Sequence, residues 1–381
     1  MRSRSYLLVL LATFLFFLAV NAFALLPGHL ARMGATSTSV GHVMGTMQVV
    51  TAVVMPLVGL LLHRVSARGS MVRGAALLAA ACVGLSMVEG WSWLLFLGRA
   101  AQGLAFAMFF VSAGALVVTL VPASRRAEGI ARFGAAMLVT NALATLAGEW
   151  LLRWGTFSDL CLAAGGCAAA AAATSLFIAP TAAAGEAPTP LAALMRVPAF
   201  AAGLVALAAT ALGFGTVFSF LSAFAAQEGL GAVSPFFAAY TAASLVVRFT
   251  SGRLADRRDR RLVIAPSLGV ASLAIAGLGA ARSGVHLAAL GTLYGAATGL
   301  AFPALMAFVV DQAEEADRAR AVALDNWAFT IGVLVATATF GPLADSIGAR
   351  TGFVVVAAAG AIGCTLPLLV RPRVAAGLPQ S

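Results

Sequence analysis

Long apolar runs alternate with short polar segments along the whole chain. The first uncharged run, LLVLLATFLFFLAVNAFALLPG, covers residues 7–28, and about 20 apolar residues let a helix cross a bilayer. Counting from one polar interruption to the next predicts two groups of six spanning helices, separated by a Pro/Gly/Ala segment at 180–196. The predicted helices cover 6–27, 39–62, 72–88, 91–120, 129–152, 159–179, 198–226, 234–251, 262–281, 285–311, 320–343 and 351–370.

Composition agrees with this pattern. The chain is 61% hydrophobic and 10% charged, whereas about a quarter of the residues in a soluble domain are charged. A soluble or extracellular enzyme is therefore excluded, and we expect an all-α membrane protein with 12 transmembrane helices in two pseudo-symmetric six-helix bundles. The basic start and the Ala22-Phe23-Ala24 triplet imitate a signal peptide, but the length of the apolar run favours a retained first helix.

The positions of the arginines predict the orientation. The chain has no lysine, and if both termini are cytoplasmic, 18 of its 24 arginines fall on the cytoplasmic side and 4 (Arg32, Arg153, Arg282 and Arg350) in outer loops. This asymmetry follows the positive-inside rule and predicts a multi-pass protein of the inner (cytoplasmic) membrane. The net charge of +10 is then explained by loops that face anionic lipid, so we expect no nucleic-acid partner.

The two groups of helices resemble each other in sequence. LGRAAQGLAFA at 97–107 matches LYGAATGLAFP at 293–303 in seven of eleven positions, on the predicted fourth and tenth helices. Duplicated six-helix halves are typical of carriers whose substrate site lies between the halves and is exposed to alternate sides. We place an N-terminal bundle at 1–180, a cytoplasmic linker at 181–197 and a C-terminal bundle with a short tail at 198–381.

A charged cluster follows the eighth predicted helix. GRLADRRDRR at 252–261 holds seven charged residues in ten positions. It resembles the signature loop of the major facilitator superfamily, with Gly252, Leu254, Asp256, Arg257 and the terminal Arg260–Arg261 pair in the matching places, while Asp259 replaces the usual small residue. The resemblance implies a cytoplasmic gate formed by Gly252, Asp256 and Arg257, with Arg248 one turn earlier pairing within the loop. Close helix contact at a small residue and a carboxylate at a helix start agree with that role.

Three further segments bear on this resemblance. The first-half copy, GLLLHR at 59–64, keeps Gly59 and Arg64 but has His63 where the aspartate belongs. LLFLGRAAQG resembles a second motif of the family, whose arginine helps couple proton movement to substrate in drug:proton antiporters; Arg99, Gln102 and Gly103 match it. The fifth predicted helix has Gly134 and Gly148 but lacks the Gly-Pro of the antiporter motif, a departure that weakens the export interpretation.

Polar side chains within the predicted helices are candidates for substrate binding. With aromatic neighbours they form a set that suits a small amphipathic organic molecule, although each phenylalanine could equally face lipid. The candidates are Asn21, Gln48, Arg99, Gln102 and Asn141 in the first half, and Phe218, Tyr240, Tyr294, Asn326 and Trp327 in the second.

Few acids lie inside the predicted helices. Asp325 lies one to two turns into the eleventh helix and Glu149 near the outer end of the fifth. An intramembrane carboxylate is costly and is by default functional. We therefore expect Asp325 and Glu149, together with Arg99, to take part in proton coupling.

The sequence also allows other kinds of function to be weighed. His29, His42, His63 and several methionines between residues 29 and 71 would suit copper, but methionine is more often packing material. The four cysteines lack metal-ligand spacing, so we expect no metal or cofactor. HExxH, GxSxG and P-loop motifs are absent, which argues against an enzyme and against ATP as the energy source.

These observations predict a secondary active transporter. We expect a monomer that exports small amphipathic organic compounds by alternating access, in exchange for protons. Import of a small metabolite, or of a metal or metal complex such as copper, is the alternative.

Overall fold

The computed structural model describes residues 4–61, 65–88, 90–122, 125–180, 195–256, 261–314 and 317–370, which are helical or in short connections and contain no strand. The N-terminal half contains α1 (Arg4–Ala22), the 3-10 turn η1 (Phe23–Leu25), α2 (Leu26–Arg32), α3 (Ser37–Leu61), α4 (Ala67–Ser86), α5 (Leu94–Leu120), α6 (Arg126–Leu152) and α7 (Phe157–Leu176). The C-terminal half contains α9 (Pro198–Gln227), α10 (Ser234–Asp256), α11 (Arg261–Leu278), α12 (Gly284–Asp311), α13 (Arg318–Ile347) and α14 (Ala349–Leu369).

Every predicted spanning segment is helical. Among the described residues, ten helices are long and apolar enough to cross a membrane, and α10 and α14 complete the predicted set. The ends differ by a few residues: α4 begins at Ala67 instead of residue 72, α5 at Leu94 instead of 91, and α13 ends at Ile347 instead of 343. Residues 181–194 of the predicted linker lie outside the described residues.

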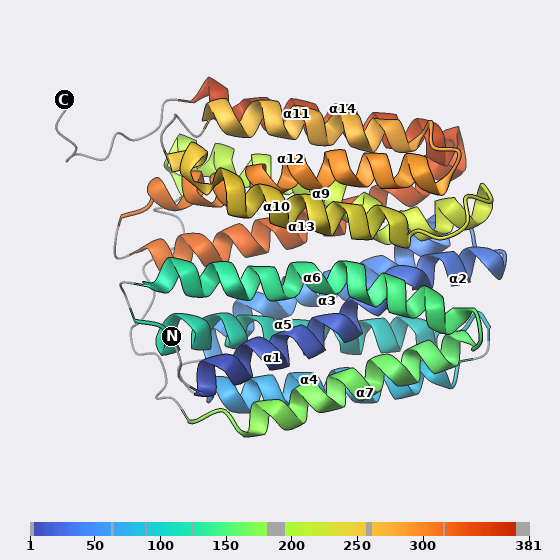
Figure 1. Cartoon of the computed structure of the whole chain (residues 1–381), viewed down its shortest axis with the longest axis horizontal. Helices are drawn as coiled ribbons and strands as arrows, with labels where there is room; N and C mark the ends of the chain where they lie inside the picture. The colour runs from blue at the N-terminus through green and yellow to red at the C-terminus, as the bar shows by residue number, and fades with distance from the viewer. Residues whose placement is uncertain are drawn as a thin grey trace.

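The helices lie side by side in two groups (Figure 1). The N-terminal half occupies the lower part of that view and the C-terminal half the upper part, with α3, α6, α10 and α13 near the boundary. The start of α1 and the end of α14 lie on one side of the bundle, which we call the terminal side; the α2–α3, α6–α7, α9–α10, α11–α12 and α13–α14 connections lie on the opposite, distal side. The arginine distribution predicts that the terminal side is cytoplasmic.

The first spanning segment is broken near its distal end. After α1, the chain forms the η1 turn and continues as α2, with Pro27 in the first turn of α2. The Ser222 hydroxyl of α9 donates to Ala24 O (2.7 Å) and accepts from Gly28 N (3.0 Å). These two backbone groups would bond to each other in an unbroken helix, so a side chain from the other half is inserted into the ladder at the break.

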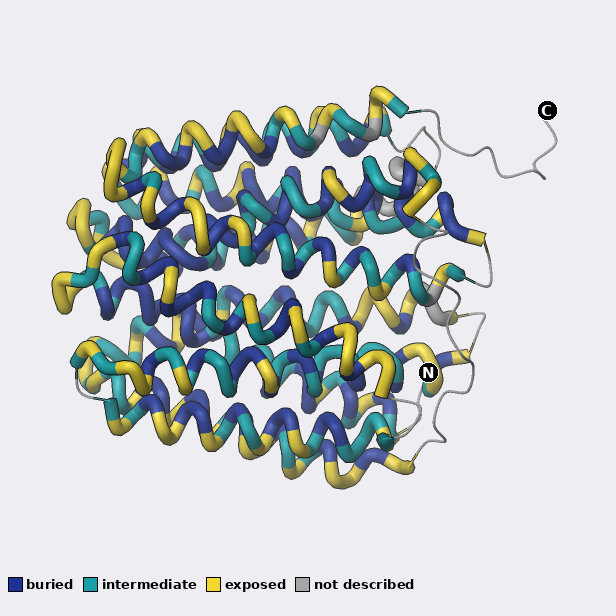
Figure 2. The backbone as a smooth tube through the Cα atoms, turned by 180° about the vertical axis from the view of Figure 1, so that it is seen from behind, coloured by how far each residue is buried: buried dark blue, intermediate teal, exposed yellow. Residues whose placement is uncertain are grey.

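Apolar and small residues build the interior. Buried positions follow the inner faces of the helices and exposed positions their outer faces (Figure 2), and large apolar side chains such as Val53, Phe249, Leu273 and Ile362 are exposed on those outer faces. Exposed apolar surface of this extent is disfavoured in water and agrees with a lipid-facing perimeter. Cys82 and Cys161 are buried as free thiols.

Glycines permit a close helix contact in the C-terminal half. Gly291, Gly295 and Gly299 are spaced four residues apart on α12 and face the α10 backbone, where an added Cβ would overlap Phe236, Tyr240 and Ser244, respectively. Small residues at this spacing let helix backbones approach each other. At the α13–α14 junction, Gly348 has φ +83°, a left-handed conformation that glycine adopts without strain, and this permits the abrupt turn.

Candidate functional site

Helices of the two halves meet in specific pairs. α3 packs against α13, α6 against α10, and α2 against α9. The α3–α13 contact is close, because a Cβ on Gly41 would lie 2.5 Å from Thr337 O and one on Gly341 would lie 2.5 Å from Ser37 O. On the α6–α10 pair, Thr241 donates to Leu138 O (3.4 Å). A site between the halves is therefore bordered by α3, α6, α10 and α13.

Three of the predicted substrate residues lie in one aromatic group in the C-terminal half. The ring of Phe218 on α9 stacks on Phe214 at 3.9 Å between centroids and lies 5.8 Å from the ring of Tyr240 on α10. Tyr240 is in turn 5.7 Å from Tyr294 on α12. Tyr240 and Tyr294 are buried, whereas Phe218 is half-buried. The structure thus brings together three predicted substrate residues that lie on three different helices and far apart in the sequence.

The predicted residues of the N-terminal half are partly connected. Asn21, at the end of α1, donates through Nδ2 to Thr140 Oγ1 on α6 (2.8 Å), one residue before Asn141. Asn141 is buried and Gln48 on α3 is half-buried. Asn21 therefore links α1 to α6 at the residue next to Asn141, while Gln48 lies on a different helix.

Arg99 and Gln102 form a pair inside the N-terminal half. Both are buried, and Arg99 Nη1 donates to Gln102 Oε1 at 2.5 Å. The guanidinium lies 6.0 Å from the Phe23 ring centroid, over the η1 break. Arg99 Nε and Gln102 Nε2 have no hydrogen-bond partner among the described residues. Because α5 begins at Leu94, Arg99 lies about 7.5 Å from the helix start, not the 12 Å that the predicted helix implies.

Asp325, Asn326 and Trp327 are consecutive on α13 but have different surroundings. Asp325 is 7% exposed, and its Oδ1 has no hydrogen-bond partner among the described residues. Asn326 Nδ2 donates to Val322 O of its own helix (2.8 Å). Trp327 reaches the other half, donating through Nε1 to Ala52 O on α3 (2.9 Å). This part of α13 therefore combines a buried acid, one oxygen of which is unpartnered among the described residues, with a contact between the halves.

Glu149 has backbone partners in the other half. Its Oε1 accepts from Val233 N (2.6 Å) and Ser234 N (3.2 Å) at the start of α10. Asp345, which the sequence interpretation does not include, makes the corresponding contact from α13: Oδ1 accepts from Ser37 N (2.9 Å) and Oδ2 from Thr38 N (2.8 Å). Its position near the end of α13, matching that of Glu149 near the end of α6, is the sequence signal that could have found it.

The proposed gate is described in part. Gly252 and Asp256 lie in the last turns of α10, but the side chains of 251–256 and all of Arg257 lie outside the described residues, as does His63. Arg248 is described. Its Nη1 lies 3.7 Å from the position of a Cβ built on Gly134 of α6, so its guanidinium faces the other half. Its Nε is buried without a hydrogen-bond partner among the described residues.

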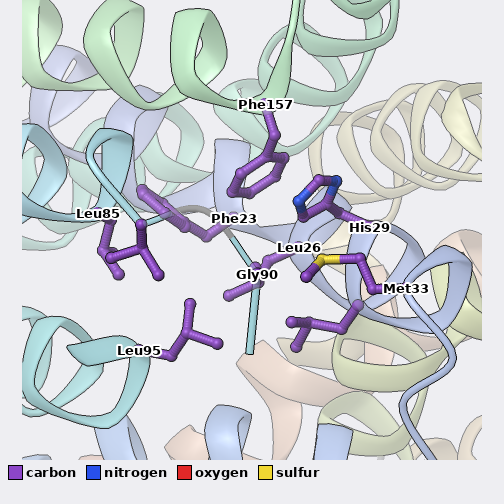
Figure 3. A pocket seen from close by; sticks show the side chains of 10 residues that line it. Phe23, Leu26, His29, Met33, Leu85, Gly90, Leu95 and Phe157 are labelled. Carbon is purple, nitrogen blue, oxygen red and sulfur yellow. The ribbon is translucent and has the colours of Figure 1, made fainter. Parts of the chain in front are cut away.

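A pocket beside the η1 break contains part of the histidine and methionine cluster. His29 of α2 and Met33, the residue after α2, line it together with Phe23, Leu85, Leu95 and Phe157 (Figure 3). The His29 ring stacks on Phe157 at 4.3 Å. The pocket has a volume of about 10 Å³, near the smallest that holds a water molecule. The described residues contain no group of three His, Cys, Asp or Glu side chains that could hold a metal ion.

Similar folds occur among transporters of known structure. A bacterial homologue of the human lysosomal transporter Spinster, solved in an inward-facing, unoccupied conformation, matches with a TM-score of 0.77 and 15% identity, over 97% of this chain and 96% of that one. The nucleoside transporter NupG, solved as a mutant, matches with 0.75 and 13% over 96% and 99%. The human organic anion transporter MFSD10 (TETRAN) matches with 0.71 and 16% over 96% and 99%.

No curated protein matches the chain by sequence. The family model of the Major Facilitator Superfamily matches residues 9–238 and 232–381, which together include nearly all of the chain. With the paired six-helix halves, this match establishes the family and a transporter in place of an enzyme. The protein is a multi-pass membrane transporter that belongs to the Major Facilitator Superfamily.

Proposed function

We propose that this transporter exports small amphipathic organic compounds in exchange for protons, and that Asp325 binds the transported proton. The observation that carries the proposal is the surroundings of Asp325, a buried carboxyl with one oxygen unpaired among the described residues. A charged carboxylate without a partner is costly in such an environment. Proton binding removes this cost, so the protonation of Asp325 is linked to the conformation that buries it.

The position of Asp325 provides a route from proton binding to movement of the halves. Trp327, two residues further along α13, bonds to α3 of the other half. A change of water access at Asp325 would therefore accompany a change at the α3–α13 contact. Glu149 is the second proton candidate, but its described partners are backbone N–H groups, which favour a charged acceptor.

The side chains between and beside the halves suggest the class of substrate. Phe214, Phe218 and Tyr240 supply aromatic surface, while Asn21, Asn141 and Gln48 supply hydrogen-bonding groups on the N-terminal half. Such a combination suits a molecule with an apolar body and a few polar atoms. The fold likeness to the human organic anion transporter is compatible with an organic substrate and does not define its charge.

The contacts on the distal side suggest the conformation. The cross-half hydrogen bonds of Ser222, Glu149 and Asp345 lie there, whereas those of Thr241 and Trp327 lie further along the helices. Among the described residues the cross-half bonds at helix ends are therefore distal, as they would be in a carrier closed on that side. In our proposal the terminal side is cytoplasmic, so this conformation accepts substrate from the cytoplasm. Asp256 of the signature loop, with Arg257, then forms the cytoplasmic gate once the terminal side closes.

Uptake into proteoliposomes tests the proposal. The purified full-length protein is reconstituted, a proton gradient is imposed in either direction, and a panel of amphipathic organic cations, anions and neutral compounds is tested. We expect accumulation of at least one compound only when its movement is opposite to that of protons. Accumulation in the same direction as proton flow would contradict proton exchange and favour the import alternative. Equal accumulation under proton gradients of either direction would also contradict proton exchange.

A further inference from the structure

Two carboxylates on the distal side each cap a helix of the opposite half. Glu149 of α6 accepts from the start of α10, and Asp345 of α13 accepts from the start of α3. The first N–H groups of a helix have no partner within that helix. They also carry the positive end of the helix dipole, so a carboxylate is a favoured acceptor.

The Asp345 contact completes the cap of α3. Thr36 Oγ1 accepts from Ser39 N (3.2 Å), as a normal N-cap residue does. Ser37 N and Thr38 N remain, and the two oxygens of Asp345 accept one each, at 2.9 and 2.8 Å. Ser37 is buried, so loss of Asp345 would leave its N–H without this acceptor. The N–H groups at the start of α3 thus find acceptors both in their own half, at Thr36, and in the other half, at Asp345.

On the α6–α10 pair, Glu149 likewise accepts from backbone N–H groups at the start of a helix of the other half. Val233, immediately before α10, and Ser234, its first residue, are both buried. Glu149 Oε1 accepts from Val233 N at 2.6 Å and from Ser234 N at 3.2 Å, and Oε2 lies 3.3 Å from Ser234 N. The carboxylate therefore supplies acceptors at the first turn of a helix in the other half.

The two contacts occupy equivalent places in the two halves. Glu149 is three residues before the end of α6, the fifth spanning segment of its half, and Asp345 is two residues before the end of α13, the fifth of the other. Their targets α3 and α10 are the second spanning segments. Each half thus contributes one carboxylate and one helix start, and both contacts would break together if the distal side opened.

We propose that Glu149 and Asp345 are positioning residues of the transport cycle, which form a two-part distal latch that holds the halves together on that side. The latch rests on the alternating access included in the proposed function, but requires neither proton coupling nor a particular substrate. When the distal side opens, both carboxylates and both helix starts pass to water. The difference in hydrogen bonding between the two conformations sets part of their equilibrium.

Another carboxylate on the same side offers a matched control. Asp159 caps its own helix, α7, accepting from Thr156 N at 2.7 Å in a capping box. Its substitution by Asn weakens a helix cap within one half and leaves the contacts between the halves unchanged. An effect of Glu149→Gln or Asp345→Asn that Asp159→Asn does not share must therefore come from the contact between halves.

Distances between spin labels on the two halves test the latch. In a full-length background with the four native cysteines replaced, Trp154→Cys and Val285→Cys place labels at exposed distal positions of opposite halves (83% and 78% exposed). A second pair, Ile130→Cys and Leu262→Cys, reports the terminal side. The protein is measured in lipid nanodiscs without substrate or gradient, so the result is independent of proton coupling and of substrate identity.

We expect each of Glu149→Gln and Asp345→Asn to raise the ratio of distal-open to distal-closed protein about fivefold, the factor that loss of a helix N-cap typically corresponds to. The double variant should raise it about 25-fold, because the two sites are separate and act on the same equilibrium. The terminal-side distance should shorten in the same molecules. General loosening of the fold would instead broaden the distance distributions of both label pairs.

Two outcomes would overturn the latch. One is a distance distribution for the double variant that equals that of Asp159→Asn. The other is a longer distal distance without a shorter terminal one. If Glu149→Gln or Asp345→Asn does not fold, Glu149→Asp and Asp345→Glu keep the charge but move it by one methylene. If the latch exists, these variants should also raise the ratio of distal-open to distal-closed protein, but by less than the amide variants. An unchanged distance distribution would contradict the latch.

Discussion

Arg99 and Asp325 are both buried ionisable residues, but their surroundings give them different expected roles. Arg99 bonds to Gln102 of its own helix and lies near Phe23 of its own half. Asp325 has an oxygen without a partner among the described residues, on a helix that contacts the other half. A guanidinium that bonds within its own helix suits holding or orienting groups within one bundle, whereas a buried acid with one oxygen unpartnered among the described residues suits reversible proton binding.

At Asp325, we predict that substitution by Asn separates transport from the proton gradient. An amide has similar size but does not bind a proton in this range, so the variant should lose its response to a pH gradient and still exchange substrate at equilibrium. Uptake with and without a gradient measures this. Glu314→Gln, at an exposed acid just after α12, is the control and should behave like the parent. If Asp325→Asn still concentrates substrate, another group carries the proton.

At Arg99, we predict that a positive charge alone is insufficient for transport at the parental rate. Lysine would keep the positive charge but lose the planar fork of donors, so Arg99→Lys should lower the initial rate about tenfold, nearly as much as Arg99→Ala. Arg73→Lys on the exposed surface of α4 is the matched control and should be neutral. Rates are compared at equal protein levels. Rescue by lysine would show that only the charge matters, and parental rates in both variants would leave Arg99 as a helix brace.

At the scale of elements, backbone approach decides which helices can separate. The α12 glycines lie against α10 within one half, and the Gly41 and Gly341 contacts join α3 to α13 across the halves. If each half moves as a rigid body, the α10–α12 contact within one half must persist in every conformation. The α3–α13 contact between the halves must loosen on the side that opens. The same small-residue packing thus supports both a rigid half and a closable boundary.

We predict that Gly295→Ala destabilises the C-terminal half. Its Cβ would overlap the Tyr240 backbone, and overpacking of this kind typically costs about 1–3 kcal/mol. The melting temperature in detergent should fall by roughly 2–8 °C. Gly269→Ala on α11 has open space around the new methyl group and should leave the melting temperature unchanged or slightly raised. Equal effects from the two variants would disprove tight α10–α12 packing as the reason.

At the scale of the whole molecule, the two halves, the common side of the start of α1 and the end of α14, and the arginine distribution agree with one topology. The described arginines near helix ends lie on the side that the helix count assigns to them: Arg68, Arg125 and Arg261 on the terminal side, and Arg153 and Arg350 on the distal side. One missed helix would have reversed every later assignment. The remaining question is which side faces the cytoplasm.

Reporter fusions answer that question. We predict that fusions after residues 190 and 375 both report a cytoplasmic location, because the arginine-rich terminal side should remain inside. A fusion after residue 154, in the α6–α7 connection on the distal side, should report the opposite side and is the internal control. An external signal at 190 or 375 would contradict the predicted orientation.

The sequence alone determined the spanning helices, the duplication and the family. Hydropathy depends on each segment's own composition, because the bilayer requires about 20 apolar residues whatever their neighbours are. The repeat at 97–107 and 293–303 and the GRLADRRDRR loop could be found for the same reason: they are contiguous. Residue types also singled out Arg99 and Asp325, since charges inside apolar helices are conspicuous.

Only the tertiary structure decided which of these residues meet. The sequence interpretation treats Glu149 as a proton candidate and omits Asp345, yet both cap helix starts in the opposite half. Ser222 occupies a break in a helix 194 residues away in the chain. Such contacts depend on how two rigid halves are placed against each other. That placement results from packing and hydrogen bonding summed over many residues, and no local pattern encodes it.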